Sequence, residues 1–357
     1  MKLSDFTTRI MRKNTTNATD IPLTISSKDG LINQNDFFNK QVASKDMSGY
    51  YLLHRGEYAY NKSYSVGYDF GSIKRLEKYD MGALSTLYIC FALTKFSSDF
   101  IKHYFDSLKW YREIYMISAE GARNHGLLNV PTEDFFATLH TLPTDEAEQA
   151  KIASFLDALT ARIEKQRSLV ENLKKYKRGL LKQVFNENCT WDEVPLGKIA
   201  TIYQPQTISS EQLVENGKYP VYGANGQIGW YNDFNHDSEQ IAICCRGASC
   251  GTVNYIPAYS WITGNAMVIN IADSIILKKF VYHQLCSQNL SYMISGSGQP
   301  QIVRTPCVEH KIFVPTSEVQ AKITALFDLL DQKIAIQEKV LDTLIITKKG
   351  YLQKIFV

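Results

Sequence analysis

Residues 149–185 read QAKIASFLDALTARIEKQRSLVENLKKYKRGLLKQVF, and residues 320–356 read QAKITALFDLLDQKIAIQEKVLDTLIITKKGYLQKIF. The two stretches align without a gap at an offset of 171 residues, and 13 of the 37 aligned positions are identical. Self-similarity over such a length indicates an internal duplication. These two stretches therefore divide the chain into repeated segments and the segments that lie outside them.

Both stretches are predicted to form long helices. In each copy, seam positions follow one another at alternating steps of four and three, which is the period of a coiled-coil seam. At about 1.5 Å per residue, roughly 40 residues make a rod of about 60 Å. The candidate seam residues are Leu156, Ile163, Gln166, Val170 and Lys177 in the first copy, and Phe327, Ile334, Gln337, Leu341 and Lys348 in the second. Towards the ends, the seam is predicted to continue through Leu180, Val184, Tyr351 and Ile355.

The seam contains polar residues at matching positions of the two copies. Gln166 corresponds to Gln337, and Lys177 corresponds to Lys348. A polar residue in a seam costs stability but fixes register and partner. The simplest arrangement pairs the two helices with each other, antiparallel, because a large segment intervenes between them; homodimerisation through the same seams is the alternative.

The start of the second helix also carries a local signal. Ser317 and Gln320 have the spacing of a capping box, in which each side chain bonds the backbone N–H of the other residue. The sequence therefore predicts that the Gln320 side chain turns back onto Ser317.

The segments outside the helices, 1–143 and 186–315, are rich in β-branched and aromatic residues with Gly and Asn turn signals, as mixed, strand-rich domains are. Their ends correspond to each other where they lead into the helices. The predicted fold is therefore α+β, with two strand-rich domains, a central helix at 144–185 and a C-terminal helix at 316–357. The helices would form an antiparallel coiled coil with pseudo-two-fold symmetry. Because the domains have diverged further than the helices, we expect one shared task for the helices and two separate tasks for the domains.

Composition excludes several classes of protein. Hydrophobic residues make up 45% of the 357 residues, which excludes a disordered chain. There is no apolar run of membrane-spanning length and no signal-peptide pattern, so we expect a cytoplasmic protein. Seven cysteines without such a signal indicate reduced thiols, and Cys245 and Cys250 lack a second Cys/His pair at zinc-ligand spacing.

Signatures of catalysis are missing as well. The sequence contains no GxxxxGK[ST], HExxH or GxSxG motif, and no Asn is followed by Pro, as an amino-methyltransferase motif would require. We therefore expect no catalytic residues, no metal and no cofactor bound by this chain.

The charge balance bears on nucleic-acid binding. The whole chain carries a net charge of +3, but residues 186–315 hold seven Lys and Arg against ten Asp and Glu. Such a domain is not expected to hold a phosphate backbone tightly alone. Reading base edges needs only a few Arg, Lys, Asn, Gln and Ser side chains on loops. If DNA is the ligand, much of the electrostatic attraction should come from a partner.

The chain resembles a known family over its full length. The element LP…EQ.KIA.FLD.L..RI….L..L..YKRGLL…F occurs at 142–185 and again, in weaker form, at 314–356, and it separates two dissimilar domains. NGQIGWY (225–231), RGASCGTV (246–253) and RNHGLLNV (123–130) add to the likeness. In this combination the chain resembles the specificity subunit of type I restriction-modification systems.

The resemblance implies a non-catalytic DNA-recognition subunit. Each globular domain would be a target-recognition domain that reads one half of a bipartite DNA sequence, and the helices would set the spacer. Readers held about 60 Å apart or less are about one to two turns of B-DNA apart. Two methyltransferase subunits would dock on the repeated regions and supply S-adenosylmethionine, and a nuclease-translocase subunit would join for cleavage. The alternative is a coiled-coil scaffold with two β-rich protein- or glycan-binding domains.

Candidate base-reading residues are polar or aromatic side chains on predicted loops. For the first domain they are Asn61, Lys62, Tyr64, Arg123, Asn124 and His125. For the second they are Tyr222, Asn225, Gln227, Arg246, Ser249, Gln299, Gln301 and Arg304. Arg246 and Arg304 are the only arginines in 186–315, so a bidentate contact with guanine has few other candidates there. The alternative for each arginine is a salt bridge or a loop brace, and for His125 a bond to the backbone.

Overall fold

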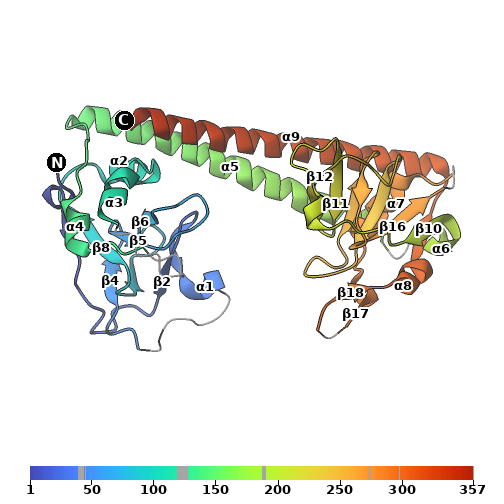
Figure 1. The fold of residues 1–357 in the computed structure, drawn as a ribbon, viewed down its shortest axis with the longest axis horizontal. Coiled ribbons are helices and arrows are strands. Elements are labelled where there is room, and N and C mark those ends of the chain that lie inside the picture. The colour runs from blue at the N-terminus through green and yellow to red at the C-terminus, as the bar shows by residue number, and fades with distance from the viewer. Residues whose placement is uncertain are drawn as a thin grey trace. The chain divides into compact units, whose positions relative to one another are not determined.

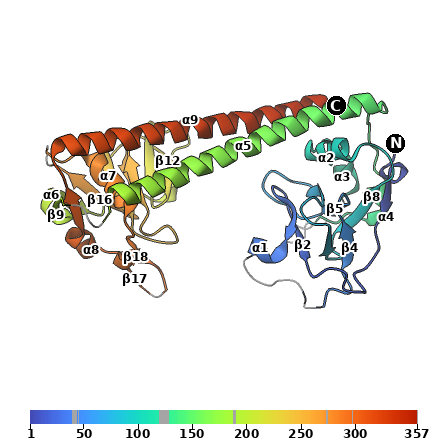
Figure 2. The same ribbon diagram turned by 180° about the vertical axis from the view of Figure 1, so that it is seen from behind.

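A computed structural model describes residues 1–38, 44, 46–118, 128–186, 190–272, 275–296 and 298–356. The chain divides into two compact units, Met1–Lys165 with Leu341–Val357 (unit 1) and Gln166–Val340 (unit 2). Each unit contains a strand-rich part and a stretch of both long helices, α5 (Glu146–Val184) and α9 (Ser317–Ile355), as Figures 1 and 2 show. The boundaries predicted at 143, 185 and 315 stay a prediction.

Unit 1 contains two four-stranded sheets. The first has the order β1-β8-β5-β6, with every neighbouring pair antiparallel, and the second has the order β3-β2-β7-β4. The strands are β1 (Thr7–Arg9), β2 (Pro22–Ser26), β3 (Gly30–Asn33), β4 (Tyr51–His54), β5 (Tyr58–Asn61), β6 (Ser72–Arg75), β7 (Met81–Leu84) and β8 (Ile89–Leu93). The helices are η1 (Leu3–Asp5), α1 (Gln34–Phe38), α2 (Ser98–Asp106), α3 (Tyr111–Ile117) and α4 (Thr132–Ala137).

Unit 2 contains a four-stranded antiparallel sheet of order β10-β16-β13-β14, a three-stranded sheet of order β12-β11-β15 and two strand pairs, β17-β18 and β19-β9. The strands are β9 (Asp192–Pro195), β10 (Ala200–Tyr203), β11 (Tyr219–Gly223), β12 (Gly226–Tyr231), β13 (Gln240–Cys244), β14 (Val253–Ile256), β15 (Trp261–Ile262), β16 (Ala266–Ile271), β17 (Ile294–Ser295), β18 (Gln301–Ile302) and β19 (Lys311–Val314). The helices are α6 (Leu196–Ile199), η2 (Ser210–Gln212), α7 (Lys278–Ser287), η3 (Ser291–Met293) and α8 (Arg304–Glu309).

The first sheet of unit 1 and the four-stranded sheet of unit 2 have the same topology. In chain order, β1, β5, β6 and β8 occupy the places that β10, β13, β14 and β16 occupy in unit 2. The last of these strands is followed by a helix in both units, α2 in unit 1 and α7 in unit 2. The second sheets correspond in part, since β3-β2-β7 has the order and strand directions of β12-β11-β15, while β4 is an addition in unit 1 and the pairs β17-β18 and β19-β9 are additions in unit 2. The two strand-rich parts are therefore built on one plan with different additions.

Each core joins its sheet to both long helices. In unit 1, Leu156 of α5 and Phe356 are buried with Phe100 of α2. In unit 2, Phe327 of α9 and Phe185 are buried with Phe280 of α7. Burial of large aromatic side chains is the main source of stability at such joints.

The long helices run antiparallel within each unit. In unit 2, Gln166 Nε2 donates to Gln337 Oε1 at 2.8 Å, and Lys174 pairs with Glu338 at 2.8 Å. In unit 1, Lys348 Nζ lies 2.8 Å from the hydroxyl of Thr160. Further contacts join Lys177 to Asp331 and Phe155 to Tyr351. The supercoil and the duplication themselves stay predictions.

Burial along the helices follows the predicted seam except at its ends. Leu156, Ile163, Val170, Phe327 and Ile334 are buried, and the other five candidate seam residues are half-buried. Tyr351, predicted to lie in the seam, is 42% exposed, whereas Leu352 is buried; this part of the prediction is wrong. The reason is that the end of α9 turns its buried side towards the globular core of unit 1, which holds both Leu352 and Phe356.

The predicted capping box at Ser317 is also wrong. The Gln320 side chain instead accepts a hydrogen bond from the backbone of Leu277 and donates to the carbonyl of Pro315, each at 3.0 Å. A long-range partner has replaced the local one. Among the residues that the structure describes, no helix is both long and apolar enough to cross a membrane.

Candidate nucleic-acid interface

Four of the described candidates lie on two loops that occupy equivalent places in the two sheets, Lys62 and Tyr64 in unit 1 and Arg246 and Ser249 in unit 2. In unit 1 the loop between β5 and β6 covers residues 62–71, and in unit 2 the loop between β13 and β14 covers residues 245–252. The first loop residue accepts the same backbone bond in both units. Leu128 N–H donates to Lys62 at 3.0 Å, and Ile302 N–H donates to Cys245 at 3.0 Å. Each loop is thus held by the segment that leads towards the next short helix.

In unit 2 this pairing brings several candidates together. Arg246 and Gln301 form an antiparallel backbone bridge, and Gly247 N–H donates to the carbonyl of Pro300 at 3.2 Å. The residues Arg246, Gln299 and Gln301 are exposed. A guanidinium and amide groups therefore stand close together on an open surface, which is the chemistry that reads purine edges.

Other candidates in unit 2 have local partners. The hydroxyl of Ser249 lies 3.3 Å from the sulfur of Cys244. Arg304 begins α8, and its Nε donates to the carbonyl of Ile202 at 2.7 Å. This bond favours the loop-brace alternative for that nitrogen, so Arg246 is the better-placed candidate of the two.

The remaining three candidates of unit 2 lie on the β11–β12 hairpin. Tyr222 and Gln227 are paired in register, and exposed Asn225 lies in the turn before Gly226, whose φ is +106°. The turn at 263–265 links this hairpin to the β13–β14 loop: Thr263 N–H donates to Tyr222 at 2.9 Å, and Cys245 N–H donates to Asn265 at 3.0 Å. Hairpin and loop are thus neighbouring parts of one surface.

In unit 1 the described candidates lie at the start of the β5–β6 loop. Asn61 ends β5, and its Oδ1 accepts a bond from the N–H of Ser63 at 3.0 Å. Lys62 is half-buried, and Tyr64 is 55% exposed. The candidates Arg123, Asn124 and His125 lie outside the described residues.

One exposed residue of this loop is not among the predicted candidates. Val66 is 87% exposed, the highest value among the large apolar side chains of the residues described. Its sequence signal was the Val-Gly pair between Ser65 and Tyr68, which has the form of a tight turn.

Neither loop surface has the features of a catalytic or metal site. Within the described ranges, no three His, Cys, Asp or Glu side chains are placed to hold a metal ion. Burial raises the pKa of the Cys307 thiol to about 11, and burial also raises the pKa of Cys245. These thiols are therefore protonated at neutral pH and unsuited to act as nucleophiles.

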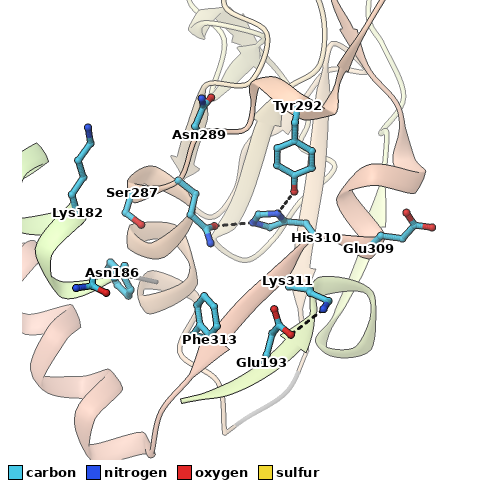
Figure 3. Close-up of a pocket in the computed structure, with 12 residues that line it drawn as sticks. Lys182, Asn186, Glu193, Ser287, Asn289, Tyr292, Glu309, His310, Lys311 and Phe313 are labelled. Carbon is cyan, nitrogen blue, oxygen red and sulfur yellow. Dashed lines mark hydrogen bonds and ion pairs between the residues drawn. The ribbon is translucent and has the colours of Figure 1, made fainter. Parts of the chain in front are cut away.

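A cavity of about 580 Å³ in unit 2 lies among α7, β9 and β19, and none of the candidate residues lines it (Figure 3). His310 on its wall is hydrogen-bonded to Tyr292 and to Gln288, the latter at 2.8 Å. Lys311 pairs with Glu193 at 2.9 Å. Burial lowers the pKa of His310 to about 4, so the imidazole is neutral and acts as a structural bridge.

Residues 188–344 match the model of the type I restriction modification DNA specificity domain. The type I restriction enzyme EcoprrI specificity subunit of Escherichia coli is 30% identical over 196 residues, which cover 52% of this chain and 49% of that protein. A Mycoplasma genitalium protein named as a type I specificity subunit is 25% identical over 60% of each chain. The chain thus spans about half to three fifths of these curated relatives.

Two solved structures share the fold over the whole chain. The crystal structure of a type I restriction-modification S subunit from M. genitalium has a TM-score of 0.62 at 19% identity, covering 100% of this chain and 95% of that one. A second structure, described as showing complex assembly and conformational transition of the type I R-M system, has a TM-score of 0.61 at 18% identity and covers 100% and 96%. These matches confirm a mixed α+β fold of the predicted kind.

Proposed function

We propose that the two units of this chain read the two halves of a bipartite DNA target. The premise is that residues 188–344 belong to the type I restriction modification DNA specificity domains and that the predicted resemblance to type I specificity subunits is confirmed. One observation carries the proposal. The same sheet holds the same kind of loop in both units, but the side chains on the two loops differ. Two readers of one design with different chemistry would recognise an asymmetric, split sequence.

The duplicated frame is part of this proposal, and matching contacts support it. Gln149 and Gln320 are aligned identical residues, and their side chains accept the N–H of Ser97 and of Leu277, each at 3.0 Å. These bonds hold the start of α2 in one unit and the start of α7 in the other.

A second pair of aligned identities makes matching contacts. The carboxylate of Asp157 accepts a hydrogen bond from His103 Nε2 at 2.8 Å, and the carboxylate of Asp328 accepts one from His283 Nε2 at 3.3 Å. Residues that are identical in both copies thus join helix to domain in the same way. This is what duplication of a whole half, domain and helix together, would produce.

In this proposal the long helices form an antiparallel coiled coil that fixes the spacer between half-sites. The repeated regions dock two methyltransferase subunits, which bind S-adenosylmethionine and methylate adenine, and a nuclease-translocase subunit joins them for cleavage. The chain itself is non-catalytic and works in the cytoplasm. With seven basic against ten acidic side chains, the domain at 186–315 has only a weak attraction to phosphate of its own, so we assign most of the salt-dependent affinity to the partners.

The test is to co-express the chain with the methyltransferase subunits encoded beside it and to map methylated adenines on genomic DNA. A motif of two short specified halves around an undefined spacer is expected. Methylation without a split motif, or a stable complex that methylates nothing, would contradict the proposal. Purified chain alone, given S-adenosylmethionine and DNA, should transfer no methyl group.

A variant tests the assignment of residues. Arg246→Ala should relax one base of one half-site while assembly is unchanged, because a bidentate guanine contact supplies about 1–3 kcal/mol of discrimination. Arg304→Ala is the comparison variant, because Arg304 Nε already donates a hydrogen bond to the carbonyl of Ile202. A motif unchanged by both substitutions would remove these arginines from the reading surface. Salt-independent binding without sequence preference would favour the scaffold alternative.

A further inference from the structure

The tip of the β5–β6 loop is an exposed apolar side chain on a tight turn. The backbones of Ser65 and Tyr68 exchange hydrogen bonds of 2.7 and 3.3 Å and enclose Val66 and Gly67. Gly67 has a φ of +81°, the value that a type II turn needs at its third position. This turn projects Val66 into solvent, where 87% of the residue is exposed.

The turn is braced by polar contacts on the side away from its tip. The hydroxyl of Ser65 lies 2.9 Å from that of Ser27, which lies 3.1 Å from that of Ser72 on β6. At the start of the loop, Lys62 accepts the N–H of Leu128. A rigid loop loses little conformational entropy on binding, and a β-branched valine has few rotamers to lose. Val66 is thus pre-organised for contact.

The equivalent loop of unit 2 carries different chemistry. There Arg246 and Gln301 present a guanidinium and an amide. Where a DNA base edge is read in the major groove, a guanidinium suits guanine, whereas an apolar side chain suits the C5 methyl group of thymine. The two loops have the same place in the frame but differ in the base that they suit.

We propose that Val66 is a specificity-determining residue that contacts the C5 methyl group of a thymine in the half-site read by unit 1. The inference rests on the proposed function and adds to it the base that Val66 contacts, thymine, and the group contacted on that base, the C5 methyl group. Tyr64, which is 55% exposed, belongs to the same loop. Isolated exposed apolar residues are common on proteins, but this one stands on the equivalent of the Arg246 loop and at a braced tip.

The experiment uses the complex with its methyltransferase partners and a duplex that carries the mapped target. Each thymine of both halves is replaced, one at a time, by deoxyuridine, which pairs identically but lacks the methyl group. Competition binding at fixed salt should show a three- to fivefold loss at one position, about the effect of burying one methyl group. Val66→Ala should weaken binding to the thymine target similarly and should no longer distinguish thymine from deoxyuridine at that position.

Leu87→Ala is the matched control, because Leu87 is an exposed apolar residue (68%) in the same unit but between β7 and β8. It should retain the wild-type discrimination. Equal affinity for thymine and deoxyuridine at every position, or discrimination that survives Val66→Ala, would overturn the inference while a split methylation motif still stood. Absence of the split motif would instead overturn the proposed function.

Discussion

Gln320 offers a direct test of how the long helices hold the domains. Its side chain is fully buried, with 0% exposure, and bonds the N–H of Leu277 and the carbonyl of Pro315, each at 3.0 Å. Leu277 immediately precedes α7 and is its N-cap, without a side-chain cap bond of its own. Gln320→Ala removes both bonds at once.

The expected loss follows from the two backbone groups that remain. A buried donor or acceptor left without a partner costs about 1–3 kcal/mol, which applies to the buried carbonyl of Pro315, whereas the bond to Leu277 is only part-buried and adds less, so the total loss is about 2–4 kcal/mol. Water entering the space left by the shorter side chain would bring the loss towards the lower end. A loss of about 3 kcal/mol is a large share of the 5–15 kcal/mol typical of folded domains.

Urea unfolding measures the total loss, and hydrogen exchange read by mass spectrometry assigns it to a unit. Amides of α7 should lose protection in Gln320→Ala. Gln149→Ala removes the matching pair of bonds, to Ser97 and Pro143, and should expose α2 instead. Gln332→Ala, on an exposed face of α9, should stay within about 0.5 kcal/mol of the unsubstituted chain. If either buried glutamine behaves like Gln332, the joint does not depend on these bonds.

Three further predictions follow from the buried groups. Burial lowers the pKa of His140 and of His310 to about 4 in the folded state, whereas an imidazole in the unfolded chain has a pKa of about 6.5. Between about pH 4 and about pH 6.5 the unfolded state therefore binds more protons than the folded state. The free energy of unfolding should be at its full value above about pH 6.5 and should fall by up to about 3 kcal/mol per histidine towards pH 4. Urea midpoints that stay level between these pH values would contradict the prediction. Phe356→Ala should cost about 3–5 kcal/mol in urea unfolding, because the ring is buried against two aromatic rings of α2; a loss below about 1 kcal/mol would contradict the packing. Replacing Gln166 and Gln337 together by Leu should raise the melting temperature but let the methylated motif accept more than one spacer length, since the polar pair fixes register; a lower melting temperature with one spacer would refute it.

The helices were the most predictable part of the chain. Each of the two aligned stretches was predicted to be a long helix, and the structure has α5 and α9 there. A seam period sustained over ten turns leaves little freedom for another structure, because each slip would expose apolar residues. The seam prediction was wrong at Tyr351 because the end of α9 packs on the globular core of unit 1 and not only on α5.

The candidate site was predictable in residue type more than in arrangement. Arg246 and Gln301 are far apart in sequence, and only the backbone bridge between them makes one surface. Such pairing leaves no local pattern. The capping box predicted for Gln320 was wrong for the same reason. The spacing to Ser317 describes a local bond, whereas the partner of Gln320 in the structure, Leu277, is 43 residues away. Val66 was missed because one exposed valine has no periodicity.

The positions that are identical in the two aligned stretches have a physical explanation in these joints. Gln149 and Gln320 hold the start of a domain helix, and Phe185 and Phe356 fill the same place in two cores. A change at such a position would cost stability in its own unit, so the two aligned positions are under the same physical constraint. The loop positions carry no such cost, since Val66 and Arg246 are exposed and leave the core intact when replaced. One frame can therefore present an apolar tip in one unit and a guanidinium in the other, and substitutions confined to the loops should change the base that is read without changing how the chain folds.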